Sequence, residues 1–177
     1  LKEYEGYELM RVDDRTGRTD VALSTRTKKS NDWKADIYLS IHHNAGINGG
    51  SGGGITVYRY PNSSKMTKAM LERLYNELIK QTGLKGNRAK PLNDTNFQVL
   101  RQTNAPAVLI ENGFMDSRTD VPIILSDSHA KKSARAIVNW LASEFKLKQK
   151  PKPTPKPQNN DKGFYRVVAG SYKDKTN

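Results

Sequence analysis

Two apolar segments of this chain each end in a polar residue that can carry chemistry, and this arrangement constrains the fold most. Asp36–Ile41 leads directly into His42, and Ala107–Ile110 leads directly into Glu111. In open α/β sheets, substrates bind just beyond the carboxyl ends of the strands. An imidazole and a carboxylate brought there by two separate strands predict a metal ligand, His42, and a general base, Glu111. The first hypothesis is therefore a zinc hydrolase.

The remaining pattern alternates strands with amphipathic helices, which predicts an α/β fold. We expect a mostly parallel, twisted sheet flanked by helices on both sides. The predicted strands cover Tyr7–Val12, Asp36–Ile41, Ile55–Tyr60 and Ala107–Ile110, and the predicted helices cover Val21–Trp33, Ser64–Gln81 and Ser128–Lys146, with Gly83 as a helix stop and a short apolar piece at Phe97–Leu100.

The charge is unevenly distributed. Eight of the 30 Lys and Arg residues and two of the 18 Asp and Glu residues lie in 148–177, so this segment carries half of the net charge of +12. A basic excess indicates an anionic partner, such as a wall polymer, a membrane surface or a nucleic acid. Aromatic residues do not alternate with the basic ones as in a base-stacking surface, which makes nucleic acid the least favoured partner.

The chain has no cysteine, which excludes disulfides, thiolate zinc ligands and a cysteine nucleophile. Any metal must be held by His, Asp or Glu. No apolar run reaches the length of about 18 residues that a membrane-spanning helix needs. The chain begins at Leu1 without an initiator Met or a signal peptide, so we interpret it as a fragment.

His42 and His43 are adjacent, and adjacent residues of a strand point to opposite faces. The two imidazoles therefore cannot hold one metal if the strand continues, and Tyr38, Ser40 and His42 are expected to share a face. A lone histidine is more often structural, but Glu111 on a second strand favours a ligand role for His42. His129 opens the last helix and is interpreted as an exposed capping residue.

Glu111 has an alternative explanation as a salt-bridge partner or a cap at a strand end. Asn112–Gly113 after it predicts a sharp turn that would aim the carboxylate into a cleft. Gly49–Gly54 does not have the strand–loop–helix context of a phosphate-binding loop, and no G-x-S-x-G motif is present. We interpret this glycine-rich stretch as a flexible loop beside the site. The substrate-binding residues are not predicted.

Two motifs resemble a known family. Ala35–Ala45, with Ser40-Ile-His-x-Asn44, and Val99–Asp116, with Glu111-x-Gly-Phe114, are similar to the zinc-dependent N-acetylmuramoyl-L-alanine amidases of the amidase-3 type. These are bacterial cell-wall amidases, or autolysins, and phage endolysins. The resemblance extends over Leu1–Phe145. It implies that His42 is a zinc ligand and Glu111 the catalytic glutamate.

The resemblance also implies that part of the site is missing. Enzymes of this family take two further zinc ligands, a histidine and a glutamate, from an opening strand and helix that would lie upstream of Leu1. We therefore expect a sheet lacking its first strand and a partial catalytic domain at 1–147. Glu3, Glu5 and Glu8 come too late in the family order to replace the lost glutamate.

The end of the chain predicts a tethered binding module. Residues 148–162 alternate Pro and Lys, which is typical of an extended, disordered linker. Residues 163–177 resemble the first strand of a sporulation-related (SPOR) repeat, whose family binds peptidoglycan. A catalytic domain tethered to a wall-binding module would gain a high local concentration of substrate.

These features together predict a secreted, monomeric, zinc-dependent amidase acting on peptidoglycan at the cell wall, or one released at lysis if a phage encodes it. It would cleave the bond between N-acetylmuramic acid and L-alanine. The alternative is a catalytically incomplete fragment that only binds peptidoglycan. A nucleic-acid-binding protein is a third, weaker hypothesis.

Overall fold

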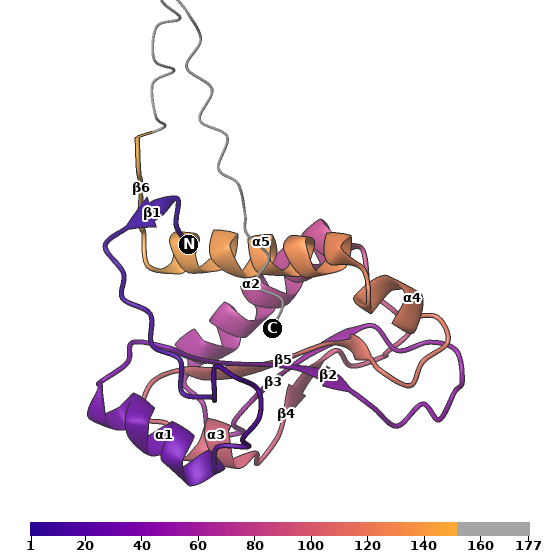
Figure 1. Cartoon of the computed structure of the whole chain (residues 1–177), viewed down its shortest axis with the longest axis horizontal. Coiled ribbons are helices and arrows are strands. Elements are labelled where there is room, and N and C mark those ends of the chain that lie inside the picture. Colours follow the sequence, from indigo (N-terminus) through magenta and orange to yellow (C-terminus); the bar gives the residue numbers. More distant parts are fainter. Residues whose placement is uncertain (152–177) are drawn as a thin grey trace, which may run out of the picture.

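The computed structural model describes residues 1–151 and has a four-stranded sheet at its centre (Figure 1). The sheet contains β2 (Tyr38–Asn44), β3 (Ile55–Arg59), β4 (Leu92–Asp94) and β5 (Ala107–Phe114), in the order β2-β5-β3-β4. β2 pairs with β5 in parallel and β3 with β4 in parallel, whereas β3 and β5 are antiparallel. Two of the three pairings are thus parallel, as predicted, but the sheet is mixed. β2 is an edge strand.

Helices cover both faces of the sheet (Figure 1). On one face lie α2 (Lys65–Thr82) and α5 (Asp127–Glu144), which bury the main apolar core. This core contains Ile55, Val57, Val108 and Ile110 from the sheet, and Leu71, Leu74, Leu78, Ile137 and Trp140 from the helices. Close packing of apolar side chains between the helices and the sheet is the main stabilising contribution.

The opposite face carries a smaller core and the short helices α1 (Leu23–Asp32) and α3 (Gln98–Arg101) (Figure 1). Its buried residues are Tyr38, Val99, Leu100, Ala107 and Leu109. The turn α4 (Val121–Ile124) follows β5. This smaller core fills only the amino-terminal part of the face, which leaves the carboxyl ends of β2 and β5 for polar residues.

The predicted ends of α2 are confirmed. Ser64 is the N-cap, and its hydroxyl accepts a hydrogen bond from the Thr67 backbone N–H. Gly83 follows the last turn in the left-handed conformation, with φ of 73°. This conformation is easily reached only by glycine, so the residue ends the helix as expected.

Three strand predictions differ from the structure. Tyr7–Val12 forms no strand, and Val12 from this segment packs against the smaller core. A two-residue strand, β1 (Tyr4–Glu5), pairs instead with β6 (Lys148–Gln149). The chain thus remains paired for two residues beyond the predicted start of the linker. Residues 152–177, which include residues 152–162 of the predicted linker and the SPOR-like segment, lie outside the described residues.

β5 does not end at Ile110, and Asn112–Gly113 does not form the predicted turn. The strand continues to Phe114 because Ile55 and Thr56 of β3 keep pairing with Asn112 and Glu111. Gly113 adopts φ of 104°, which a glycine tolerates without breaking the strand. β2 likewise continues to Asn44, with a register shift between His42 and Asn44.

Candidate active site

His42 and Glu111 lie side by side on one face of the sheet. They are register partners in the parallel pair β2–β5, and partners in a sheet point to the same face. Thr56 of β3 is the partner of Glu111 on its other side. The three side chains therefore form a row across three strands, beyond the smaller core. The structure brings together the two residues that the sequence predicted.

Glu111 is partly buried, and its Oε2 atom is fully buried without a hydrogen-bond partner. Burial raises the pKa of Glu111 to about 7, because the charged form loses solvation. Among the ion pairs of residues 1–151 there is none to Glu111, and it caps no helix there. The alternative structural roles are thus not observed. A carboxyl group with this pKa can accept and return a proton near neutral pH.

His42 lies on the edge strand and is exposed to solvent. Its Nε2 atom lies 2.6 Å from Ser40 Oγ, two residues earlier on the same face. Although the residue as a whole is exposed, the surrounding protein removes part of the ring's solvation and so lowers the pKa of His42, and the nearby Arg26 and His43 lower it further. This shift favours the neutral imidazole, which is the form that ligates metals. His43 lies at the next position of β2, where side chains point to the other face.

The sequence did not predict that Thr56 and Tyr58 of β3 lie beside Glu111. The Tyr58 hydroxyl accepts hydrogen bonds from Asn44 Nδ2 and from Thr56 Oγ1, both at 3.3 Å. Tyr58 and Thr56 share the face of Glu111, since both alternate with the buried Val57. The alternation of side chains in Ile55–Arg59 shows that Thr56 and Tyr58 share one face of the strand. It would have placed them beside Glu111 only if β3 had been known to lie next to β5.

The glycine-rich loop beside the site is not the flexible segment that we predicted. Asp116 Oδ2 accepts hydrogen bonds from the backbone N–H groups of Gly46, Ile47 and Asn48, each at 2.8 Å. These bonds lower the pKa of Asp116. Asn87 Oδ1 accepts a further bond, from Gly53 N–H. Acceptors distant in sequence therefore fix the loop.

A buried carboxylate connects this loop to the end of β5. Asp120 is 1% exposed, and its Oδ2 accepts hydrogen bonds from Gly54 N–H at 2.7 Å and Phe114 N–H at 2.9 Å. A side chain at Gly54 would collide with the backbone at Lys85 and Gly86, so this close approach requires glycine. The backbone that follows Glu111 is thus held from two directions.

Comparison with known proteins identifies the family. A family model described as N-acetylmuramoyl-L-alanine amidase matches residues 3–143. This chain belongs to the N-acetylmuramoyl-L-alanine amidase family. The sporulation-specific N-acetylmuramoyl-L-alanine amidase of Bacillus subtilis is 34% identical over 175 residues, which are 99% of this chain and 62% of that protein. The chain thus spans less than two thirds of this curated relative.

Other relatives of the amidase family agree. A probable cell wall amidase of Staphylococcus aureus, LytH, is 35% identical over 144 residues, covering 81% of this chain and 44% of LytH. The crystal structure of an N-acetylmuramoyl-L-alanine amidase from Clostridium difficile 630 superimposes with a TM-score of 0.68 and 28% identity, over 75% of this chain and 69% of that one. The predicted α/β class, with a central sheet flanked by helices, is confirmed.

The side chains at the candidate site are of types that bind zinc, but residues 1–151 bring together too few of them for a catalytic zinc site. A catalytic zinc takes three protein ligands and keeps an open position. His42 supplies one suitable ligand, and the unpartnered Glu111 oxygen lies beside it. Within residues 1–151, however, no three His, Asp or Glu side chains cluster closely enough to hold a metal.

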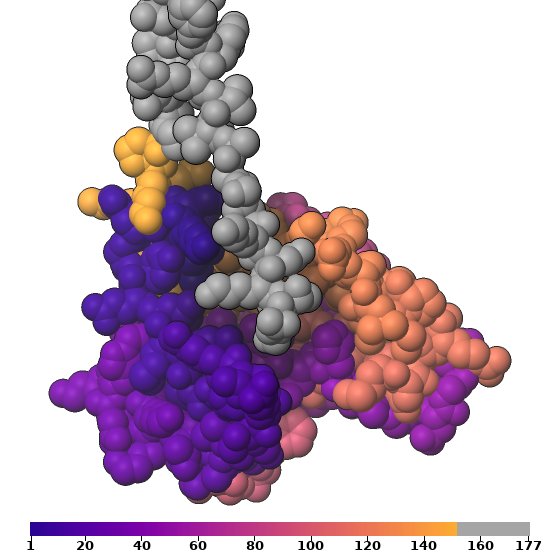
Figure 2. Space-filling model, viewed as in Figure 1, coloured from indigo at the N-terminus to yellow at the C-terminus, as the bar shows by residue number. Residues whose placement is uncertain are grey.

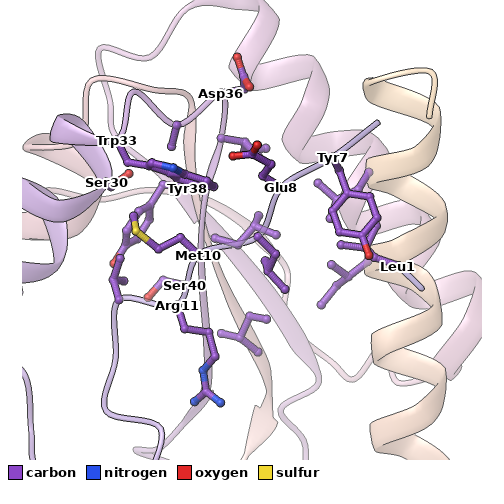
Figure 3. Close-up of a pocket in the computed structure, with 18 of the residues that line it drawn as sticks. Leu1, Tyr7, Glu8, Met10, Arg11, Ser30, Trp33, Asp36, Tyr38 and Ser40 are labelled. Carbon is purple, nitrogen blue, oxygen red and sulfur yellow. The ribbon is translucent and has the colours of Figure 1, made fainter. Parts of the chain in front are cut away.

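A groove of about 1200 Å³ runs along the unpaired side of β2 (Figure 3). The amino-terminal segment crosses it, with Met10 and Arg11 near Ser40 and Tyr38, and α5 lies beyond Leu1 and Tyr7. Figure 2 shows the same segment at the surface between α1 and β6. Ile41 is 55% exposed, although its face of the sheet is apolar elsewhere. His42 lies in the lining of this groove.

His129 is not the exposed cap that we predicted. Ser126 is the N-cap of α5, and its hydroxyl accepts a bond from His129 N–H, which places His129 inside the first turn. The imidazole is 4% exposed, and its Nδ1 atom is buried without a partner. Burial lowers the pKa of His129. It packs near Ser133, which bonds to Asn112 on the face opposite Glu111, and so has no place in the candidate site.

Proposed function

We propose that the protein hydrolyses the amide bond between N-acetylmuramic acid and L-alanine in peptidoglycan, with Glu111 as the general base. The observation that carries the proposal is the unpartnered, buried oxygen of Glu111 beside His42. A buried acceptor without a donor is costly to a protein unless another molecule supplies the donor. The attacking water is such a donor.

Each residue then has a defined role. His42 holds zinc, which when bound supplies the positive charge that activates water near neutral pH. Glu111 accepts the proton of the attacking water and passes it to the leaving amine of L-alanine. Its pKa of about 7 suits both transfers, because the group must gain and lose a proton in each cycle.

We further propose that two more zinc ligands come from chain outside the described residues, on the open side of β2. Two observations support this. β2 has an unpaired edge beside a groove that His42 lines, and Ile41 is exposed there. A further strand on this edge would cover Ile41 and could bring ligands next to His42. The upstream histidine and glutamate implied by the family resemblance are the proposed ligands.

The cellular setting is part of the same proposal. The names of the relatives, a cell wall amidase among them, support a secreted protein that acts at the cell wall. No helix of residues 1–151 is long and apolar enough to cross a membrane. The SPOR-like segment and the monomeric state stay predictions.

A non-catalytic wall-binding protein is the second candidate. The observation in its favour is the single convincing zinc ligand among residues 1–151. Under this alternative, the basic excess of the chain would provide salt-sensitive affinity for acidic wall polymers.

The test is Glu111→Gln in the full-length protein, assayed on purified peptidoglycan by the release of amino groups. We expect turnover to fall about 100- to 10,000-fold, because the base is lost, while the zinc content stays unchanged. Glu72→Gln, on the exposed side of α2, is the matched control and should keep full activity.

Two results would contradict the proposal. If Glu111→Gln loses zinc together with activity, Glu111 is a ligand and not the base. If the unaltered protein binds peptidoglycan and releases no amino groups, the wall-binding candidate replaces the amidase.

A further inference from the structure

Tyr58 places a hydroxyl group beside Glu111 that the proposed mechanism does not use. Its backbone lies opposite Leu109 of β5, but its hydroxyl oxygen lies 3.3 Å from Thr56 Oγ1 and 3.3 Å from Asn44 Nδ2. Thr56 is the register partner of Glu111, and Asn44 follows His42 by two residues. The phenol therefore extends along the sheet from Leu109 toward the level of the His42–Glu111 pair.

Both hydrogen-bond partners of Tyr58 donate to its oxygen, which leaves its own O–H group free to donate. Asn44 Oδ1 accepts the Ala45 N–H at 2.8 Å, which leaves Nδ2 to donate to the phenol. Thr56, only 2% exposed, donates from the other side. A phenolic oxygen that accepts two hydrogen bonds still has one hydrogen to donate. No acceptor for it is found in the described part of the chain.

The ring itself is also held in place. The Phe97 ring packs against it, with 5.7 Å between the ring centroids and an angle of 45° between the planes. Tyr58 is only partly buried, so part of its side chain faces solvent. A donor on a partly exposed side chain beside a proton acceptor matches an amide substrate, whose carbonyl oxygen gains negative charge during hydrolysis.

We propose that Tyr58 is a second catalytic residue, which donates a hydrogen bond to the carbonyl oxygen of the scissile amide as that oxygen becomes negative. This inference rests on the proposed amidase function. The proton stays on Tyr58 throughout, because Glu111 performs the proton transfer. Thr56 and Asn44 act as positioning residues, since they leave the phenol only its donor role.

The experiment is Tyr58→Phe in the full-length protein, with kcat, KM, zinc content and thermal unfolding measured together. Removing one donor to a developing oxyanion costs about 100- to 1000-fold in kcat when the donor acts alone. Because a zinc ion held at the site would share this charge, we expect kcat to fall about 10- to 100-fold, with KM within about twofold. Zinc content and unfolding temperature should not change.

Tyr60→Phe is the matched control. This substitution also removes a phenolic hydroxyl, from the residue that directly follows β3. The Tyr60 side chain makes no hydrogen bond within residues 1–151, so kcat should not change. Thr56→Val tests the positioning role. It should lower kcat about 3- to 10-fold alone and add little in the Tyr58→Phe background, because it acts through the same O–H group.

The outcomes separate this inference from the function on which it rests. If Tyr58→Phe keeps the kcat of the unaltered enzyme, or loses no more than Tyr60→Phe, while Glu111→Gln is inactive, the role of Tyr58 is refuted and the amidase function stands. A rise in KM without a fall in kcat also refutes it. If the unaltered protein releases no amino groups, both proposals fail together.

Discussion

Glu111 lies on the central strand β5, whereas His42 lies on the edge strand β2, and the surroundings of the two side chains differ accordingly. Glu111 has a paired strand on each side, and Asp120 and the glycine-rich loop support the backbone that follows it. His42 has a partner strand on one side and a groove on the other, with Ser40 as its hydrogen-bond partner.

This difference separates two requirements of the chemistry. The proposed general base needs a desolvated carboxylate, and Glu111 is one. A metal centre needs several ligands converging on one point, but no three His, Asp or Glu side chains cluster within residues 1–151, where His42 is the one proposed ligand. In the proposed mechanism, the proton-transfer side of the site is therefore organised independently of the metal side. Substitutions on each side should have different consequences.

The largest expected effect is on the His42 side. In the full-length protein, His42→Ala should abolish zinc binding and lower activity by more than about 1000-fold, since a ligand and the group it holds are lost together. The folded domain should persist, because His42 is exposed and makes one side-chain hydrogen bond. Zinc content measured by elemental analysis, together with the amidase assay, checks this.

His43→Ala is the control for this substitution. It removes an imidazole from the next position of the same strand, where side chains point to the opposite face. It should keep both zinc and activity. Loss of zinc in His43→Ala and its retention in His42→Ala would reverse the assignment of the two histidines.

The two sides also differed in how well the sequence predicted them. The pairing of His42 with Glu111 was predictable, because each residue follows an apolar run and the carboxyl ends of strands converge. The proposed roles of Tyr58 and Thr56 were not, since they depend on β3 lying antiparallel beside β5, and strand order is not encoded in local alternation.

Two of the errors have a common physical origin in contacts distant along the chain. The glycine-rich loop looks flexible by composition, but its acceptor Asp116 lies about 70 residues away in sequence, and local patterns do not reveal such bonds. β5 passes through Asn112–Gly113 because β3 continues to pair with it. The error at His129 has a local origin, because Ser126, three residues earlier, takes the capping position and places His129 inside the first turn.

The next largest expected effect is a loss of stability when Asp120, which holds the backbone after Glu111, is replaced. Asp120→Ala should lower the free energy of unfolding by about 2–4 kcal/mol, because two buried N–H groups, of Gly54 and Phe114, lose their acceptor. Asp36→Ala, at an exposed position of the chain, should cost less than about 0.5 kcal/mol. Urea unfolding of both variants gives the comparison. Equal costs would mean that Asp120 does not stabilise this side of the site.

The smallest effect concerns the ionisation of Glu111 in the metal-free protein. Its pKa in the folded protein is about 7, above the ordinary value of 4.5, so folding favours the protonated carboxyl group. Protonation of Glu111 therefore contributes to the free energy of unfolding. This contribution is fully present below about pH 4.5 and is lost as the pH rises through 7. Glu111→Gln cannot ionise. It should therefore be more stable than the unaltered protein at pH 8 by about 1–2 kcal/mol, a figure that allows for solvent near the partly buried group.

The difference between the two proteins should shrink toward pH 5, where Glu111 is mostly protonated. Unfolding by urea in the presence of a chelator, at several pH values, measures it without any need for activity. A stability difference that does not vary between pH 5 and 8 would show that Glu111 is solvated like an ordinary surface carboxylate. The difference between Glu111, as a base desolvated in advance, and His42, as a ligand that still needs partners, would then disappear. Neither residue would be organised for catalysis before zinc binds.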